Sequence, residues 1–196
     1  MTQAAPLEFV PPEEAARANL YALLARLFSA APDAALLKAI ADQAMEGELA
    51  APWKELAEAA RQADPEAVRE EYETAFIGTG KAPVTLYTTA YAIKYSNEVP
   101  LAQLRGELDR LGLARRTEVR EPEDHFAALC DVMRHLVAKQ KNDLNAQQRF
   151  FSRWIWPTVG PLCAAIDRSD KTVFYKHVAT FSAQFCTLEH MAFEML

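Results

Sequence analysis

The sequence lacks any uninterrupted run of about 18 apolar residues, the length at which a helix begins to span a bilayer. It also contains no lysine or arginine before Arg17, so the start of the chain does not have the basic and apolar regions of an export signal. These absences argue against a transmembrane helix and a secretory leader. They predict a protein that stays in the cytoplasm.

Cysteine is scarce, and basic residues are a minority among the charged ones. Cys130, Cys163 and Cys186 are far apart, and each lies in an apolar helical pattern, which predicts buried free thiols rather than disulfides or a zinc site. The 21 lysines and arginines face 27 aspartates and glutamates, for a formal net charge of -6. This balance argues against a nucleic-acid surface or an anionic membrane and favours a cationic partner.

Complete catalytic and metal-binding motifs are also missing. The segment Gly78–Lys81, "GTGK", lacks the spacing and the following Ser or Thr of a P-loop. Adjacent side chains such as Asp124 and His125 would point about 100° apart on a helix, so they are not a preformed catalytic dyad. Asp131 and His135 have the spacing of helical metal ligands, but no further ligand accompanies them. We therefore predict no enzyme, no metal and no cofactor, and we keep a nucleotide-dependent enzyme or switch as the alternative.

Helical periodicity dominates what the sequence does contain. Glycines number only 6 in 196 residues, alanine is abundant and β-branched alternation is rare, which predicts an all-α fold. The length suits one domain, 1–196, formed by a bundle of about eight to ten helices. Apolar residues at helical spacing mark the segments 20–28, 36–44, 53–60, 68–76, 101–111, 126–137, 146–155, 159–166 and 172–195. Pro157 is expected to end or kink the helix before it.

A long irregular loop interrupts this pattern over residues 77–91. It contains two glycines, a proline and four threonines, and loops of this length in compact domains are often functional. Tyr87, Tyr91 and Tyr95 recur every four residues, so the end of the loop is predicted to form a short helix with an aromatic stripe.

The segment "EPEDH", Glu121 to His125, supports two interpretations. In the first it starts a helix, with Pro122 at the first position and Glu123 and Asp124 placed where carboxylates stabilise the helix dipole. In the second its acids form an anionic rim beside exposed aromatic residues, which would suit a basic and apolar peptide. Glu121 is a poor N-cap residue, and this weakens the first interpretation.

Three blocks together resemble a known family. They are "YETAFIGTGKAPVTLYTTAYA" at 72–92, "EPEDHFAAL" at 121–129 and the proline-broken segment with its final helix at 150–185. They are similar to the TorD/DmsD/NarJ-type redox-enzyme maturation chaperones, and the Glu-Pro-x-Asp-His block is the most specific. Two positions depart from the family: Trp154 stands where many relatives have His, and Thr89 where a Ser is common.

The resemblance implies a non-catalytic cytoplasmic chaperone, monomeric or a domain-swapped dimer. It would bind the twin-arginine leader of a molybdoenzyme precursor, its immature catalytic subunit, or both, until the cofactor is inserted. We expect an acidic rim and an aromatic groove, with Asp124 and His125 contacting the peptide or fixing the loop. The expected peptide-binding residues are Glu121, Pro122, Glu123, Asp124, His125, Tyr72, Phe76, Tyr87 and Tyr91. Tyr72 and Phe76 could instead be core residues. A helical assembly factor that binds only the mature reductase subunit is a further alternative.

Overall fold

The structure is a computed structural model that describes residues 11–78, 80, 82–91, 100–115, 121–139 and 143–196. Within these ranges the chain forms helices α1 to α9 with short 3-10 and π-helical stretches. The only β-type pairing among them is an isolated antiparallel bridge between Tyr87 and His125. None of the described helices has the length and apolar character that crossing a membrane requires. The predicted all-α bundle is confirmed.

Four helices form the first part of the fold, as predicted. They are α1 (Pro12–Ser29), α2 (Ala34–Asp42), α3 (Ala50–Gln62) and α4 (Pro65–Tyr72), with a 3-10 turn, η1 (Gly47–Leu49), before α3. Local residues explain where α2 and α4 begin. Asp33 accepts a hydrogen bond from the Leu36 N–H at 2.8 Å, and Asp64 accepts one from the Glu66 N–H at 3.3 Å, so each carboxylate satisfies an N–H that the helix leaves free.

The second part contains the remaining helices: α5 (Pro100–Arg110), α6 (Phe126–Ala138), α7 (Leu144–Phe150), α8 (Trp156–Arg168) and α9 (Phe174–Glu194). A π-helical stretch, η4 (Phe151–Ile155), joins α7 to α8. Pro157 was expected to end or kink a helix. It lies in the first turn of α8, where the missing N–H costs nothing, and the α-helical pattern is interrupted just before it.

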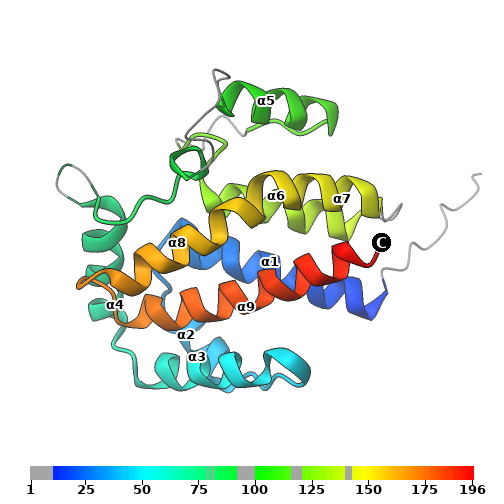
Figure 1. The fold of residues 1–196 in the computed structure, drawn as a ribbon. Helices are drawn as coiled ribbons and strands as arrows, with labels where there is room; N and C mark the ends of the chain where they lie inside the picture. Colours follow the sequence, from blue (N-terminus) through cyan, green and yellow to red (C-terminus); the bar gives the residue numbers. More distant parts are fainter. Residues whose placement is uncertain (1–10, 79, 81, 92–99, 116–120, 140–142) are drawn as a thin grey trace, which may run out of the picture.

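Helix α1 lies at the centre of the bundle. It packs against α6, while α9 packs against α8 and α3 (Figure 1). Aromatic edge contacts connect α1 to α6 and α9. Phe28 contacts Phe126 of α6 with ring centroids 5.1 Å apart, and Tyr21 contacts Phe185 of α9 with ring centroids 4.9 Å apart. These four side chains are almost completely buried, so the hydrophobic core sits between α1, α6 and α9.

A buried polar cluster also joins α1 to α9. The Glu189 carboxylate accepts hydrogen bonds from Arg17 Nε at 2.7 Å and from Arg17 Nη2 at 2.8 Å. The Tyr21 hydroxyl donates to the same carboxylate at 2.8 Å. Burial raises the pKa of Tyr21, and the charge of Glu189 adds to the rise. Because a buried charge is costly unless it is paired, this cluster fixes one register between the two helices.

The three cysteines are free thiols, as predicted. Cys130 and Cys186 are buried, and Cys163 is half-buried. Burial raises the pKa of Cys163 to about 12, so its thiol is protonated at neutral pH.

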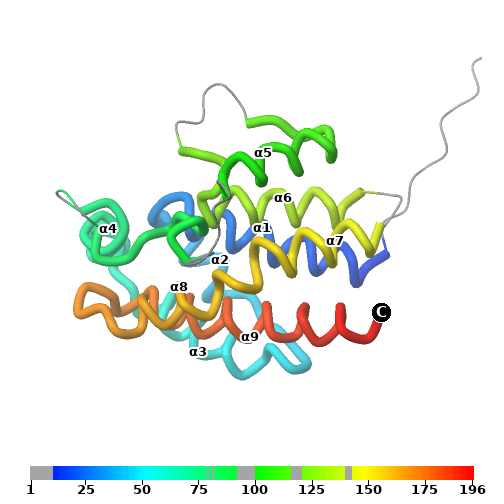
Figure 2. The backbone as a smooth tube through the Cα atoms, turned by 45° about the horizontal axis from the view of Figure 1, so that its top comes forward, coloured from blue at the N-terminus to red at the C-terminus, as the bar shows by residue number. Residues whose placement is uncertain are grey.

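Helix α5 lies at the edge of the bundle, outside the stack formed by the other helices (Figures 1 and 2). Leu104 and Leu108 are its buried apolar residues. A polar contact adds to them, because Trp154 Nε1 of η4 donates to the Glu107 carboxylate at 2.7 Å. Few contacts therefore hold α5 compared with the central helices.

Candidate functional site

The loop after α4 begins with a turn that requires glycine. A π-helical stretch, η2 (Glu73–Ile77), extends α4 and ends at Gly78, whose φ of 62° is in the left-handed region. The Gly78 N–H donates to the Glu73 carbonyl at 2.7 Å, and the Val84 N–H donates to the Ala75 carbonyl at 3.0 Å. The loop thus turns back along the end of this helix.

Backbone hydrogen bonds join the loop to the turn that precedes α6. The Thr88 N–H donates to the Asp124 carbonyl at 2.9 Å, and the Phe126 N–H donates to the Leu86 carbonyl at 2.8 Å. These bonds flank the bridge between Tyr87 and His125. Residues 82–91 and 121–125, which we call the loop–turn site, therefore form one structural unit although they are far apart in sequence.

The Asp124 side chain holds this unit together from the inside. It is only 3% exposed, and its carboxylate accepts a hydrogen bond from the Thr89 hydroxyl at 2.5 Å. A buried carboxylate needs such a partner, since an unpaired one would be strongly destabilising. Asp124 thus connects the start of α6 to the loop.

His125 is the N-cap residue of α6. Its Nδ1 accepts a hydrogen bond from the Ala127 N–H at 3.3 Å, and its ring meets the edge of Tyr87 at a centroid distance of 5.5 Å. Burial lowers the pKa of His125, against the opposing charges of Glu121 and Asp124. The neutral imidazole is the form that can accept this capping bond.

The two outer acids of the turn also have partners. The Tyr87 hydroxyl donates to Glu121, and this hydrogen bond, together with burial, raises the pKa of Tyr87 to about 12. The Glu123 carboxylate pairs with Arg105 of α5 at 3.0 Å and with Arg115 at 3.6 Å. Burial would raise the pKa of Glu123, but the Arg105 hydrogen bond and the two positive charges lower it. Of the three acids expected to form a rim, Asp124 is buried, Glu121 bonds to Tyr87, and arginines of the chain itself engage Glu123.

The helix-start interpretation of Glu121–His125 is wrong in its boundary. Helix α6 begins at Phe126 with His125 as its cap, so Glu123 and Asp124 lie before the helix rather than in its first turn. The reason is that the backbone on either side of His125 pairs with the loop. The predicted short helix with a tyrosine stripe is a 3-10 turn, η3 (Thr88–Ala90), and Tyr95 lies outside the described residues.

Tyr72 and Phe76 lie in the core. They are 6% and 8% exposed, and both rings contact Tyr175 of α9, at centroid distances of 5.7 and 4.9 Å. The Tyr72 hydroxyl donates to the Phe28 carbonyl at 3.0 Å. This burial favours the core alternative for both residues.

Other aromatic and apolar side chains of this region stay at the surface. Tyr87 is 36% exposed and Ile77 is 60% exposed. Tyr91 is half-buried, and its hydroxyl donates a hydrogen bond to the Thr85 carbonyl at 2.8 Å. The apolar surface beside the turn is therefore smaller than the sequence suggested.

The partners of several site residues could not be read from the sequence. Thr89 pairs with Asp124 across 35 positions, and Arg105 reaches Glu123 across 18, so no local spacing indicates either partner. Of the "GTGK" segment, Thr79 and Lys81 lie outside the described residues. Within the described ranges no group of three or more His, Cys, Asp or Glu residues has a metal-binding arrangement.

Comparisons with known proteins place this geometry in context. The family model described as "Nitrate reductase delta subunit" matches residues 42–187, which include the whole loop–turn site. The structure also resembles the crystal structure of a candidate redox enzyme maturation protein from Archaeoglobus fulgidus. The TM-score between the two structures is 0.54, and their sequences are 20% identical. The match covers 95% of this chain and 99% of the other. At this identity the likeness shows a shared fold. No curated protein matches the chain.

Proposed function

The chain belongs to the nitrate reductase delta subunit family, and from this membership we propose that it is a chaperone for the maturation of a molybdenum-cofactor enzyme. It binds the immature catalytic subunit of that enzyme, its twin-arginine leader, or both, and releases them after cofactor insertion. It acts by binding and catalyses no reaction. The family match over residues 42–187 carries this proposal, and the shared fold with a candidate maturation protein supports it.

We place client binding at the loop–turn site. Tyr87 exposes apolar surface there, and Glu121 and Glu123 supply carboxylates beside it. Ile77, at the end of η2 just before the loop, is a further exposed apolar residue. A leader that joins two arginines to an apolar segment would match this combination, because a guanidinium pairs with a carboxylate through two parallel hydrogen bonds. Asp124 and His125 are buried, so their role in this proposal is to hold the loop in place for the client.

The ion pair between Glu123 and Arg105 predicts how substitutions should change client binding. Arg105 donates to Glu123 through Nε at 3.1 Å and through Nη2 at 3.0 Å. An arginine of the client that reached the same carboxylate would compete with Arg105 of the chain itself. We therefore expect removal of Arg105 to strengthen client binding, whereas removal of the Glu123 charge weakens it.

The test is a fluorescence anisotropy titration of labelled twin-arginine leaders from several molybdoenzymes with the wild-type protein and three variants. We expect one leader to bind saturably, Glu123→Gln to weaken it about tenfold and Arg105→Ala to strengthen it. The control is Glu66→Gln, which makes the same substitution in an arginine–glutamate pair away from the site, the one with Arg69 at 2.7 Å on α4. Its affinity should equal that of the wild type.

A second measurement covers the case in which no leader binds. The protein is mixed with the catalytic subunit of each molybdoenzyme, purified with and without its cofactor, and the complexes are separated by gel filtration. Selective binding of the cofactor-free subunit supports a chaperone that recognises the subunit rather than the leader. Equal binding of both forms contradicts a maturation role and favours an assembly factor for the mature reductase.

A further inference from the structure

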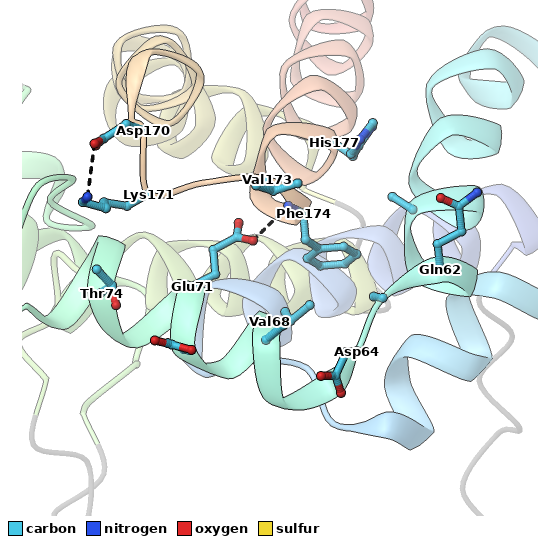
Figure 3. A pocket seen from close by; sticks show the side chains of 14 residues that line it. Gln62, Asp64, Val68, Glu71, Thr74, Asp170, Lys171, Val173, Phe174 and His177 are labelled. Atoms are coloured by element: carbon cyan, nitrogen blue, oxygen red, sulfur yellow. Dashed lines mark hydrogen bonds and ion pairs between the residues drawn. The ribbon is translucent and has the colours of Figure 1, made fainter.

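A separate groove lies between α4, the end of α3 and the start of α9 (Figure 3). Its volume is about 710 Å³, and none of its lining residues belongs to the loop–turn site. The residues that matter for its chemistry are Asp64, Val68, Glu70, Glu71, Asp170 and Val173. The volume is in the range of about 300–1,000 Å³ that binding sites for small ligands occupy, so the groove can hold a few side chains but not a whole helix.

The charge of the groove is mostly negative. Four carboxylates line it, together with the Lys171 ammonium group and the His177 imidazole. Lys171 pairs with Asp170 at 3.1 Å. Two of the other acids have structural roles. Asp64 caps α4, and Glu71 caps α9 by accepting hydrogen bonds from the N–H groups of Phe174 and Tyr175 at 3.0 and 2.8 Å.

Glu70 differs from these acids. Its side chain is exposed on α4, lines the groove and has no hydrogen bond or ion pair to any residue in the described part of the chain. Since the acids around it repel anions, a positively charged group is the ligand chemistry that this carboxylate favours.

An exposed apolar side chain borders the same groove. Val173, immediately before α9, is 74% exposed. In the lining the ring of Phe174 lies between Val173 and Val68 (Figure 3), and these two neighbours are buried. A valine at this position contributes little to the core, whereas contact with an aliphatic partner would remove it from water. The groove thus combines an available carboxylate with an uncovered apolar surface.

From this combination we propose that the groove binds a short segment of another protein in which an arginine or lysine adjoins aliphatic side chains. The basic group pairs with Glu70, and the aliphatic side chains cover Val173. The proposal is independent of client binding at the loop–turn site, because the two surfaces share no residue.

The probe for the test is a short fluorescein-labelled peptide rich in leucine and alanine that carries two arginines, with a companion in which glutamates replace the arginines. Fluorescence anisotropy should show saturable binding of the arginine peptide only. Glu70→Lys and Val173→Ser should each weaken that binding about tenfold. Serine is a suitable residue for this position at the start of α9, so the second variant should fold normally.

Two matched variants serve as controls. Glu55→Lys makes the same charge change at an exposed position on α3 outside the groove, and Met191→Ser makes a similar apolar-to-polar change on the exposed end of α9. Both should bind the peptide as the wild type does. The proposal is overturned if the arginine peptide does not bind, if Glu70→Lys leaves its affinity unchanged, or if Glu55→Lys weakens binding as much as Glu70→Lys. Because the peptide resembles the leader proposed for the loop–turn site, Glu123→Gln is titrated in parallel, and it should not weaken binding as Glu70→Lys does.

Sedimentation velocity of the protein without peptide tests whether a second copy of this chain occupies the groove instead. A monomer, or a dimer that Val173→Ser leaves intact, agrees with the proposal. A dimer that Val173→Ser dissociates would assign the groove to a second copy of this chain. Loss of leader binding in the Glu123 variant bears only on the proposed function, so failure of one proposal is distinguishable from failure of the other.

Discussion

Two buried carboxylates join distant parts of this molecule, and they do so with very different numbers of contacts. Glu189 receives three hydrogen bonds from Arg17 and Tyr21 and connects two central helices. Within the described residues, the Asp124 carboxylate receives one side-chain hydrogen bond, from Thr89, and connects a helix start to a surface loop. Segments held by few contacts open at lower free energy than the core. The comparison suggests a rigid α1–α9 core that carries a loop–turn site able to adjust to a partner.

Removing Glu189 should produce the largest effect. In Glu189→Ala the buried Tyr21 hydroxyl loses its acceptor, and the half-buried Arg17 guanidinium keeps only Glu14, so we expect the free energy of unfolding to fall by about 3 kcal/mol. Urea denaturation followed by circular dichroism measures this change. The control is Glu194→Ala, at the exposed end of the same helix, which should stay within about 0.5 kcal/mol of the wild type. Similar losses in both variants would contradict a special role for the cluster.

Removing Asp124 should have a smaller and more local effect. In Asp124→Ala the Thr89 hydroxyl loses its acceptor, which should cost about 1–3 kcal/mol of stability. Hydrogen exchange of the Thr88 and Phe126 amides, which donate across the loop–turn contact, should accelerate more than exchange in α1. Asp131→Ala, an exposed acid on α6, is the control. Uniform acceleration throughout the chain would show that the loop is as firmly held as the core.

Acidification should loosen the loop–turn site through His125. Because the pKa of His125 is lowered in the folded protein, its stabilising contribution is present above the unfolded-state pKa of about 6.5 and is lost as the pH falls through the folded-state value. Amide exchange of Ala127, corrected for the intrinsic pH effect, should therefore increase on acidification. His125→Asn keeps a capping acceptor but cannot titrate, so it should not show this increase. An equal increase in the variant would assign the effect to another group.

The smallest effect is expected from Tyr87→Phe. The hydroxyl bonds to Glu121 at the surface, and such contacts contribute little, so stability at neutral pH should change by less than about 0.5 kcal/mol. The pKa of Tyr87 is raised from its ordinary value of about 10 to about 12, so the contribution of this hydrogen bond is fully present below pH 10 and is lost as the pH rises through about 12. Ultraviolet titration of wild type and variant should differ by one tyrosine near pH 12. A difference near pH 10 would show that the bond is absent in solution.

The sequence predicted the fold well because helices are encoded locally. Periodic apolar residues located the segments that became α1 to α9, and the prolines and aspartates before them marked where several begin. The free cysteines were likewise predictable from their apolar surroundings.

The site was less predictable because its contacts are non-local. The motif Glu121–His125 was identified, but its boundary was wrong, since the pairing of Leu86 and Thr88 with the residues around His125 leaves no trace in helical periodicity. The burial of Tyr72 and Phe76 depends on Tyr175, about 100 positions away. The groove beside Glu70 was not predicted, because it exists only where α4 and α9 meet.

Hydrogen exchange measured by mass spectrometry, with the protein alone and in complex with the cofactor-free catalytic subunit of its molybdoenzyme, tests the central claim most directly. If the loop–turn site receives the client, residues 82–91 and 121–125 should gain protection in the complex, while the Glu189 end of α9 should remain unchanged. A complex in which these two segments exchange as they do in the free protein would contradict client binding at this site.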